Sequence, residues 1–156
     1  MRKNKNKLNG FTLTELIVVI AIIGILTGAI IVSLNPSARI AQSRNGVRKS
    51  DLHQIQSALE MYRSDQGSYP ATIPSDCTSS LMDNGSPPTI VYMRSVPCDP
   101  KNTGVYIYKY ALNGNGYDLA TCLETVTDSK KDSSNNPTSS SNCNGTSNWS
   151  YTLHNP

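Results

Sequence analysis

The stretch that decides the fold is GFTLTELIVVIAIIGILTGAIIVSL, residues 10–34. From Phe11 to Leu34 it is almost entirely apolar, and Glu15 is its one ionisable residue. About 20 apolar residues in a helix span the hydrocarbon core of a bilayer, so the stretch predicts a membrane-spanning helix. A carboxylate inside such a helix costs about 2–4 kcal/mol on insertion scales and is rare unless it has a function. Glu15 is therefore a candidate functional residue.

A short basic segment, MRKNKNKLNG, precedes this stretch. Residues 1–10 carry four cations and no acid. Because positively charged flanks stay on the cytoplasmic side of a membrane, we expect the chain after the helix to lie outside the cytoplasm.

These features together resemble the class III leader of type IV prepilins and pseudopilins. In that family a short basic leader ends in Gly. The mature chain then begins with Phe, has Glu as its fifth residue and continues as a long apolar run. Gly10, Phe11 and Glu15 match these positions here. The resemblance implies that a prepilin peptidase cleaves between Gly10 and Phe11 and methylates the new Phe11 amine. It also implies that the helix becomes the core of a filament, built on an assembly platform in the inner membrane.

The charges that follow the predicted cleavage site are consistent with a helix in a filament core. Cleavage would leave a cationic amine on Phe11, about one helical turn from the anionic Glu15. An unpaired charge in an apolar bundle is costly, whereas a paired one is tolerated, so pairing between subunits would set their register more than add stability. The alternative is a single-pass anchor whose Glu15 reaches the lipid headgroups. A conventional secretory signal fits less well, because the apolar run is longer than the usual h-region.

Composition limits the remainder to one small domain of about 120 residues. The net charge of +3 depends on the leader, since 10 Lys and Arg face 11 Asp and Glu without it. The basic balance therefore gives no support for nucleic-acid binding, outside a filament used for DNA uptake.

The four cysteines all follow the apolar helix, on the predicted outer side. Four cysteines outside the cytoplasm indicate two disulfides, with three possible connectivities. We favour the two sequence-local pairs, Cys77 with Cys98 and Cys122 with Cys143. Each would close a loop of about 20 residues and contribute about 3 kcal/mol in the chain-entropy model.

After the interruption at Asn35-Pro36, the sequence is helical again and amphipathic. Apolar side chains recur on one face as the stripe Leu52, Ile55, Leu59 and Tyr62. We therefore predict one long helix from Phe11 to about Asp65, bent near residues 35–36. A basic cluster lies largely off the stripe and consists of Arg39, Arg44, Arg48 and Lys49. Two interpretations of this cluster stay open. It is either a solvated or inter-subunit face, or a contact for an anion or DNA.

The head is predicted to hold a small antiparallel sheet, which makes the fold class α+β and pilin-like. Residues 105–112 alternate as a strand with Tyr106, Tyr108 and Tyr110 on one face, and residues 113–116 form a turn. Residues 117–124 return as the second strand of a hairpin, residues 149–153 form an edge strand, and residues 79–82 form a helical turn. The segments DQGSYP (65–70) and VPCDP (96–100) resemble the helix exit and the pre-sheet turn of the major pseudopilin of type II secretion.

Residues 125–147 are rich in Ser, Asn, Asp, Lys and Thr and predict a surface loop. Pseudopilins often hold calcium in a loop of this region, so the resemblance makes calcium a possible cofactor, with Asp128 and Asp132 as the acids present. Their pattern does not match closely enough to assign ligands, and solvated acids are the alternative. We predict no other metal and no catalytic residue, since the histidines lack a neighbouring nucleophile motif.

We predict a structural, non-enzymatic subunit of a type IV pilus-like filament that serves secretion, adhesion, motility or DNA uptake. Its parts are a leader at 1–10, a transmembrane and filament-core helix at 11–34, the amphipathic helical half at 35–66 and an extracytoplasmic head at 67–156. The partners would be further copies of the chain, the prepilin peptidase and the assembly platform. The chain would rest in the cytoplasmic membrane with its N-terminus inside, and then enter a periplasmic or surface filament. The alternative is a membrane-anchored binding protein that never polymerises.

Overall fold

The fold is described from a computed structural model, which covers residues 10–33, 35–133, 143 and 148–155. Most of the predicted leader and most of the loop after residue 133 lie outside these residues. The chain forms two compact units, Met1–Arg39 and Ile40–Pro156. Each unit is described by itself.

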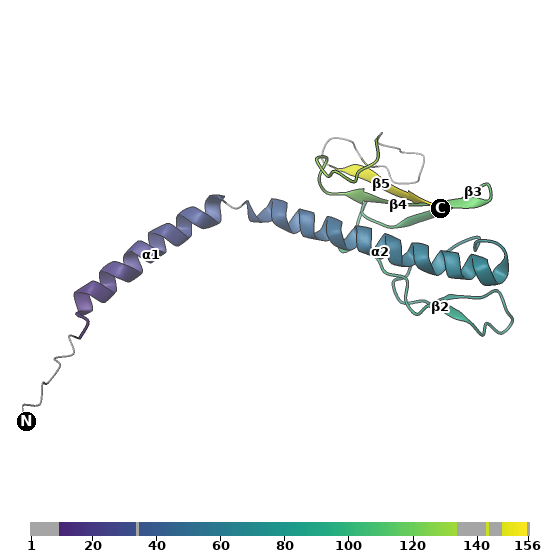
Figure 1. The fold of residues 1–156 in the computed structure, drawn as a ribbon, viewed down its shortest axis with the longest axis horizontal. Helices are drawn as coiled ribbons and strands as arrows, with labels where there is room; N and C mark the ends of the chain where they lie inside the picture. Colours follow the sequence, from purple (N-terminus) through teal and green to yellow (C-terminus); the bar gives the residue numbers. More distant parts are fainter. Residues whose placement is uncertain (1–9, 34, 134–142, 144–147, 156) are drawn as a thin grey trace, which may run out of the picture. The chain divides into compact units, whose positions relative to one another are not determined.

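The first unit contains α1, Leu13–Ser33 (Figure 1). Its start is a capping box, in which the side chains of Thr12 and Glu15 satisfy each other's backbone N–H groups. Thr12 N donates to Glu15 Oε2 at 2.9 Å, and Glu15 N donates to Thr12 Oγ1 at 3.2 Å. Residues Leu13–Ile31 are long and apolar enough to cross a membrane.

The prediction of one long bent helix is wrong, because a new helix, α2, begins at Pro36 and runs to Gln66. Asn35 has a positive φ of 44°, a left-handed conformation that Asn tolerates better than most residues. Its carbonyl then accepts hydrogen bonds from Ala38 N and Arg39 N. Pro36 therefore stands at the first position of a new helix, where its missing N–H is not needed.

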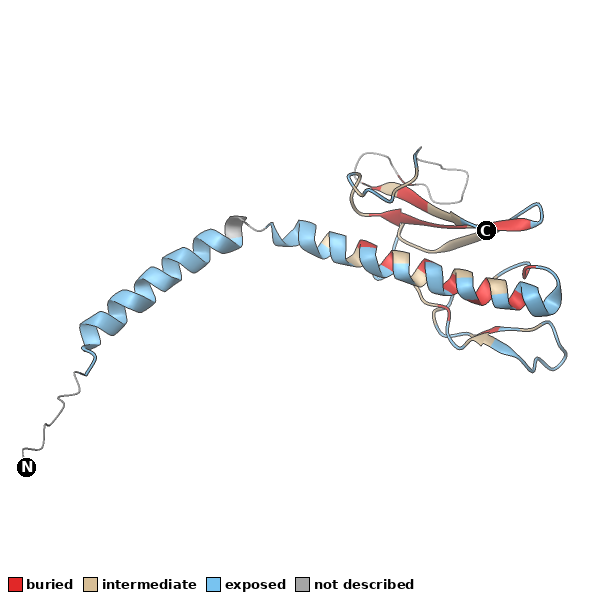
Figure 2. Ribbon diagram, in the orientation of Figure 1, coloured by how far each residue is buried: buried red, intermediate tan, exposed pale blue. Residues whose placement is uncertain are grey.

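In the second unit, α2 buries the predicted stripe against the sheet (Figure 2). The stripe residues Leu52, Ile55, Leu59 and Tyr62 are each at most 1 % exposed. They pack with buried side chains of the sheet, chiefly Tyr117, Leu119 and Leu123. The helix ends at Gln66, and Gly67 follows it with a φ of 78°, which suits a residue without a side chain.

The sheet has three antiparallel strands in the order β3-β4-β5: Lys109–Asn113, Gly116–Leu123 and Trp149–His154. A separate two-stranded sheet pairs β1, Leu81–Met82, with β2, Val91–Met93. The predicted hairpin and the C-terminal strand are thus present, and the α+β pilin-like class is confirmed. The helical turn predicted at residues 79–82 is wrong, since β1 lies there.

The first predicted strand begins later than expected, at Lys109 instead of Val105. Asn102 and Gly104 have positive φ, and a tight turn joins Thr103 to Tyr106. The three tyrosines consequently do not share one sheet face. Tyr108 donates a hydrogen bond to Asp51 Oδ2 on α2 at 2.7 Å, and Tyr110 donates one to the carbonyl of Pro70 at 2.6 Å. They are half-buried structural side chains.

Candidate functional site

The predicted assembly segment lies at the start of α1. Gly10 and Phe11 precede the helix and are exposed, Phe11 to 82 %. Glu15 is exposed in the first turn, where its carboxylate also accepts a bond from Thr12 Oγ1 at 2.7 Å. In the isolated chain Glu15 therefore caps its own helix, and the geometry leaves it accessible to a second partner.

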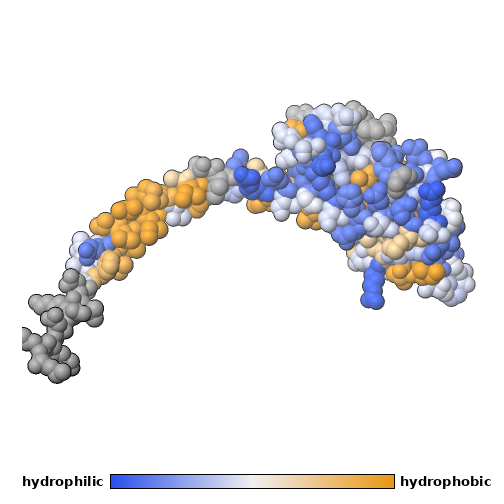
Figure 3. All heavy atoms as spheres, in the orientation of Figure 1, coloured by the Kyte–Doolittle hydropathy of each residue, from blue (hydrophilic) through white to orange (hydrophobic). Residues whose placement is uncertain are grey.

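No described residue of α1 is buried within the chain (Figure 2). Apolar side chains cover the helix, including Leu16, Ile20, Ile25 and Ile30, all more than half exposed (Figure 3). An apolar surface of this length is unfavourable in water and requires lipid or other apolar helices as its surroundings.

The basic cluster is not a solvated face, because three of its four members form ion pairs inside the head. Arg44 binds Glu124, with Nε 2.6 Å from Oε1 and Nη2 on Oε2. Lys49 Nζ lies 2.5 Å from Asp128 Oδ1. The anion or DNA interpretation loses its support, since these charges are already paired within the chain.

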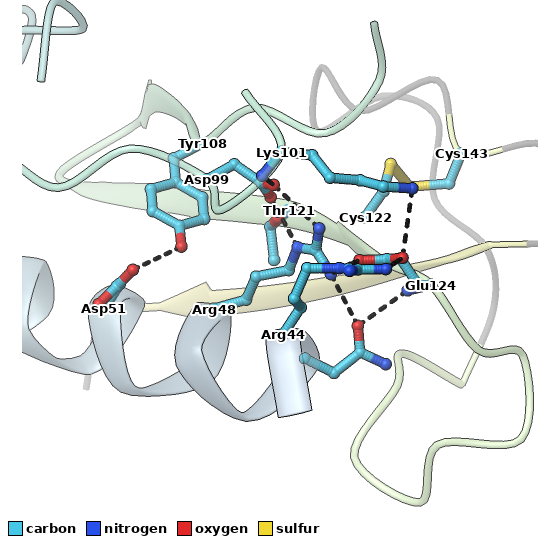
Figure 4. A network of polar contacts seen from close by, with 11 residues as sticks. Arg44, Arg48, Asp51, Asp99, Lys101, Tyr108, Thr121, Cys122, Glu124 and Cys143 are labelled. Carbon is cyan, nitrogen blue, oxygen red and sulfur yellow. Dashed lines mark hydrogen bonds and ion pairs between the residues drawn. A yellow bond between two sulfur atoms is a disulfide. The ribbon is translucent and has the colours of Figure 1, made fainter. Parts of the chain in front are cut away.

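Arg48 is the centre of this network (Figure 4). Its side chain is fully buried and forms a two-pronged contact with Asp99, with Nε 2.6 Å from Oδ2 and Nη2 2.9 Å from Oδ1. Its Nη1 also reaches Glu124 Oε1 at 2.7 Å and Asn45 Oδ1 at 2.9 Å. Its guanidinium carbon lies 4.9 Å from the ring centre of Tyr106. A buried arginine with two carboxylates and an amide has its donors satisfied.

The network sets the ionisation of its acids. Burial alone would raise the pKa of Glu124, but hydrogen bonds from Arg44, Arg48 and Lys101 outweigh it and lower that pKa to about 2. Lys101 Nζ lies 3.2 Å from Glu124 Oε2. Glu124 is thus ionised throughout the physiological range and joins the end of β4 to α2.

Sequence reasoning missed this role, although one signal was present. Arg48 stands four residues before Leu52 and so lies on the extension of the apolar stripe. A charged residue on a buried stripe requires a charged partner. The sequence does not identify the partner, since Asp99 is 51 residues away.

Both disulfides join sequence-local pairs. Cys77 bonds Cys98 and Cys122 bonds Cys143, each pair separated by 21 residues. This is the connectivity that the sequence favoured among three. The first ties the segment after Pro74 to the VPCDP turn, and the second ties β4 to the far end of the following loop.

Comparison with known proteins gives two consecutive matches along the chain. Residues 5–31 match the prokaryotic N-terminal methylation motif. Residues 37–136 match protein G of the type II secretion system. The chain belongs to this protein G family.

Among its curated relatives is type II secretion system core protein G of Escherichia coli K12, 31 % identical over 121 residues, or 73 % of this chain and 80 % of the relative. The core protein G of Pectobacterium carotovorum is 33 % identical over 104 residues, covering 60 % of this chain and 62 % of the relative. That of Aeromonas hydrophila is 38 % identical over 68 residues, covering 44 % and 46 %. No solved structure matches the chain. The predicted membership in the pilin and pseudopilin family is confirmed.

The family resemblance implies calcium as a cofactor, and the acids present for it in the loop after β4 are Asp128 and Asp132. Asp128 is held by Lys49, and both carboxylate oxygens of Asp132 accept bonds from Thr152. No group of three His, Cys, Asp or Glu that could hold a metal occurs among the described residues. Asp128 and Asp132 in this arrangement do not fit a calcium site.

The histidines hold the C-terminal strand in place. His53 Nε2 lies 3.4 Å from the Tyr151 hydroxyl, and His154 Nδ1 lies 2.6 Å from Asp118 Oδ1. Gln56 on α2 donates to the backbone carbonyl of His154 at 3.1 Å. These contacts join β5 to α2 and to β4, which is a structural role.

Proposed function

We propose that this chain is a structural subunit of the filament of a type II secretion system and polymerises through α1. The observation that carries the proposal is the apolar helix α1, none of whose described residues is buried and most of which lies within the match to the methylation motif, residues 5–31. The relatives are named core proteins of that system, which favours secretion over adhesion, motility or DNA uptake. A filament subunit has no need of an active site, and we expect no enzymatic activity.

Before assembly, α1 is stored in the cytoplasmic membrane. The basic leader keeps the N-terminus inside, and the head lies outside. The prepilin peptidase then cleaves between Gly10 and Phe11 and methylates the new amine. The assembly platform of the inner membrane moves the subunit from the lipid into the growing filament.

In the filament, α1 exchanges contacts with lipid for contacts with neighbouring copies of α1. The Phe11 amine of one subunit pairs with Glu15 of another, so that neither charge is left alone in an apolar environment. Glu15 therefore selects the register at which a new subunit docks. Its bond to Thr12 holds the carboxylate at the end of the helix until the pair forms.

The test is assembly of Glu15→Ala in cells that contain the cognate secretion apparatus. Filaments are followed by cross-linking between subunits, and the N-terminus by mass spectrometry of membrane-extracted protein. We expect a processed N-terminus at methylated Phe11 and a loss of filaments of at least about tenfold, since an uncompensated charge costs several kcal/mol. Thr27→Ala is the control, because it also replaces a polar side chain of α1, whose hydroxyl donates to the Ile23 carbonyl of the same helix at 2.7 Å.

Normal filaments from Glu15→Ala would contradict the role of Glu15. A chain that keeps Met1 would contradict processing. A wild-type chain that is processed but never cross-links to itself would support the membrane-anchored binding protein instead.

A further inference from the structure

The turn after β4, residues 125–133, carries as many positive as negative side chains, which is unfavourable for binding a cation. From Thr125 to Pro156 the sequence holds two acids, Asp128 and Asp132, and Lys130 and Lys131 lie between them. Calcium takes six to eight oxygen ligands, and its affinity rises with their negative charge. Two acids beside two lysines supply no net negative charge.

The Asp128 carboxylate is already satisfied. Lys49 Nζ lies 2.5 Å from its Oδ1, and Lys130 N donates to the same oxygen at 2.9 Å. The two side chains of the ion pair are only 22 % and 11 % exposed. Burial would raise the pKa of Asp128, but the bond from Lys49 outweighs it and lowers the pKa. A cation that bound Asp128 would therefore have to displace the ammonium group of Lys49 from this carboxylate.

Asp132 is committed to β5. Thr152 N donates to its Oδ1 at 2.9 Å, and Thr152 Oγ1 donates to its Oδ2 at 2.8 Å. The backbone N of Asp132 donates to the Ser150 carbonyl at 2.9 Å, and its carbonyl accepts from Trp149 Nε1 at 2.9 Å. Both the side chain and the backbone of Asp132 are thus hydrogen-bonded to β5.

Aromatic and covalent contacts add to the hydrogen bonds of the turn at residues 125–133. Lys49 Nζ lies 5.8 Å from the ring centre of Tyr151, and Lys131 Nζ lies 4.0 Å from that of Trp149. Both distances are within the range of cation–π attraction. The Cys122–Cys143 disulfide joins Cys143 to β4.

We propose that Lys49 holds the turn at residues 125–133, and that the Cys122–Cys143 disulfide holds Cys143, in place of a divalent cation, so that the head is stable without calcium. The ammonium of Lys49 is the built-in counter-charge of Asp128 and ties the loop to α2. This inference goes beyond the filament function and holds whether or not the chain polymerises.

Trp149 is a direct reporter, because it is the only tryptophan and its ring nitrogen bonds the turn itself. The full-length protein in detergent is treated with EDTA and then titrated with calcium chloride to millimolar concentration. Trp149 emission and Tm are followed. We expect no saturable change in emission and a shift in Tm below about 1 °C, because the carboxylates of Asp128 and Asp132 already bind Lys49 and Thr152.

Lys49→Met, which keeps much of the stem over Tyr151, is expected to lower Tm by about 3–8 °C in the same buffer and to change Trp149 emission. Lys130→Met is the matched control, since it removes the same charge from an exposed side chain of the same turn. We expect it to change Tm by less than about 2 °C.

Saturable stabilisation of the wild-type protein by calcium would overturn the proposal, whatever the variants do. Equal Tm values for Lys49→Met and Lys130→Met would also overturn it. Should Lys49→Met not fold, Lys49→Arg tests the role of the charge instead. Because it retains the charge, Lys49→Arg must fold without calcium, and its failure to do so would overturn the proposal.

Discussion

Replacing Arg48 by Met tests the central network of the head most directly. The substitution keeps an unbranched side chain in the buried position but removes the guanidinium group. Asp99, whose side chain is also fully buried, then loses its two-pronged partner and retains only weaker neighbours. Lys101 N still donates to Asp99 Oδ1 at 2.8 Å, but an amide proton does not neutralise a carboxylate.

The expected effect is large. Removing one partner of a buried ion pair destabilises a protein by about 3–5 kcal/mol, because the other charge remains buried and unpaired. The free energy of unfolding of a domain of this size is about 5–15 kcal/mol, so about a fifth or more of its stability would be lost. The corresponding fall in Tm is about 10–20 °C. The double variant Arg48→Met/Asp99→Asn should recover a large part of this, since Asn keeps an acceptor for Lys101 N without a charge.

The assay is thermal and urea unfolding of the full-length protein in detergent, followed by Trp149 emission. Arg94→Met serves as the control, because Arg94 is exposed and its substitution should change stability by less than about 0.5 kcal/mol. A loss below about 1 kcal/mol for Arg48→Met would refute the reasoning. So would a double variant that is no more stable than the single one, because the cost would then not come from the unpaired Asp99.

Three further predictions concern the same unfolding measurement. The folded pKa of Glu124 lies below its unfolded value, so its stabilisation is complete above about pH 5 and is lost as the pH falls towards 2; Glu124→Gln should flatten this pH dependence. Replacing Cys77 and Cys98 together by Ser should lower stability by about 2–4 kcal/mol, as the loss of a 21-residue closure predicts, and an unchanged urea midpoint would contradict it. Gly46→Ala in the exposed face of α2 should stabilise the head by about 0.5–1 kcal/mol, whereas Gly67→Ala, at a φ of 78°, should destabilise it by about 1 kcal/mol, and effects of the same sign would refute this pair.

Local sequence patterns predicted much of the fold. The composition of residues 11–34 indicated α1, and the spacing of Leu52, Ile55 and Leu59 indicated which face of α2 is buried. The turn signal at residues 113–116 located the β3–β4 hairpin. Each of these features depends on residues within a few positions of each other, where helix and strand periodicity act directly.

The features that the sequence did not predict depend on long-range partners or on single backbone angles. The positive φ of Asn35 separates α1 from α2. Residues 105–108 alternate in sequence like a strand, but the turn between Thr103 and Tyr106 prevents one from forming there. The ion pairs of Arg44 and Lys49 join residues 80 and 79 positions apart. Charge alone does not identify such partners, because any of several acids satisfies the same arginine until the fold is known.

We infer that the network also helps to set the register of α2 on the sheet. An apolar stripe that repeats every three or four residues tolerates sliding by a turn, because one Leu or Ile then replaces another. Such a slide would place Arg48 at the position of Leu52, among buried apolar side chains, and leave Asp99 without its partner. That error costs several kcal/mol, whereas the correct ion pair need add little net stability. We therefore infer that Arg48 and Asp99 act chiefly by excluding wrong alignments of α2 on the sheet.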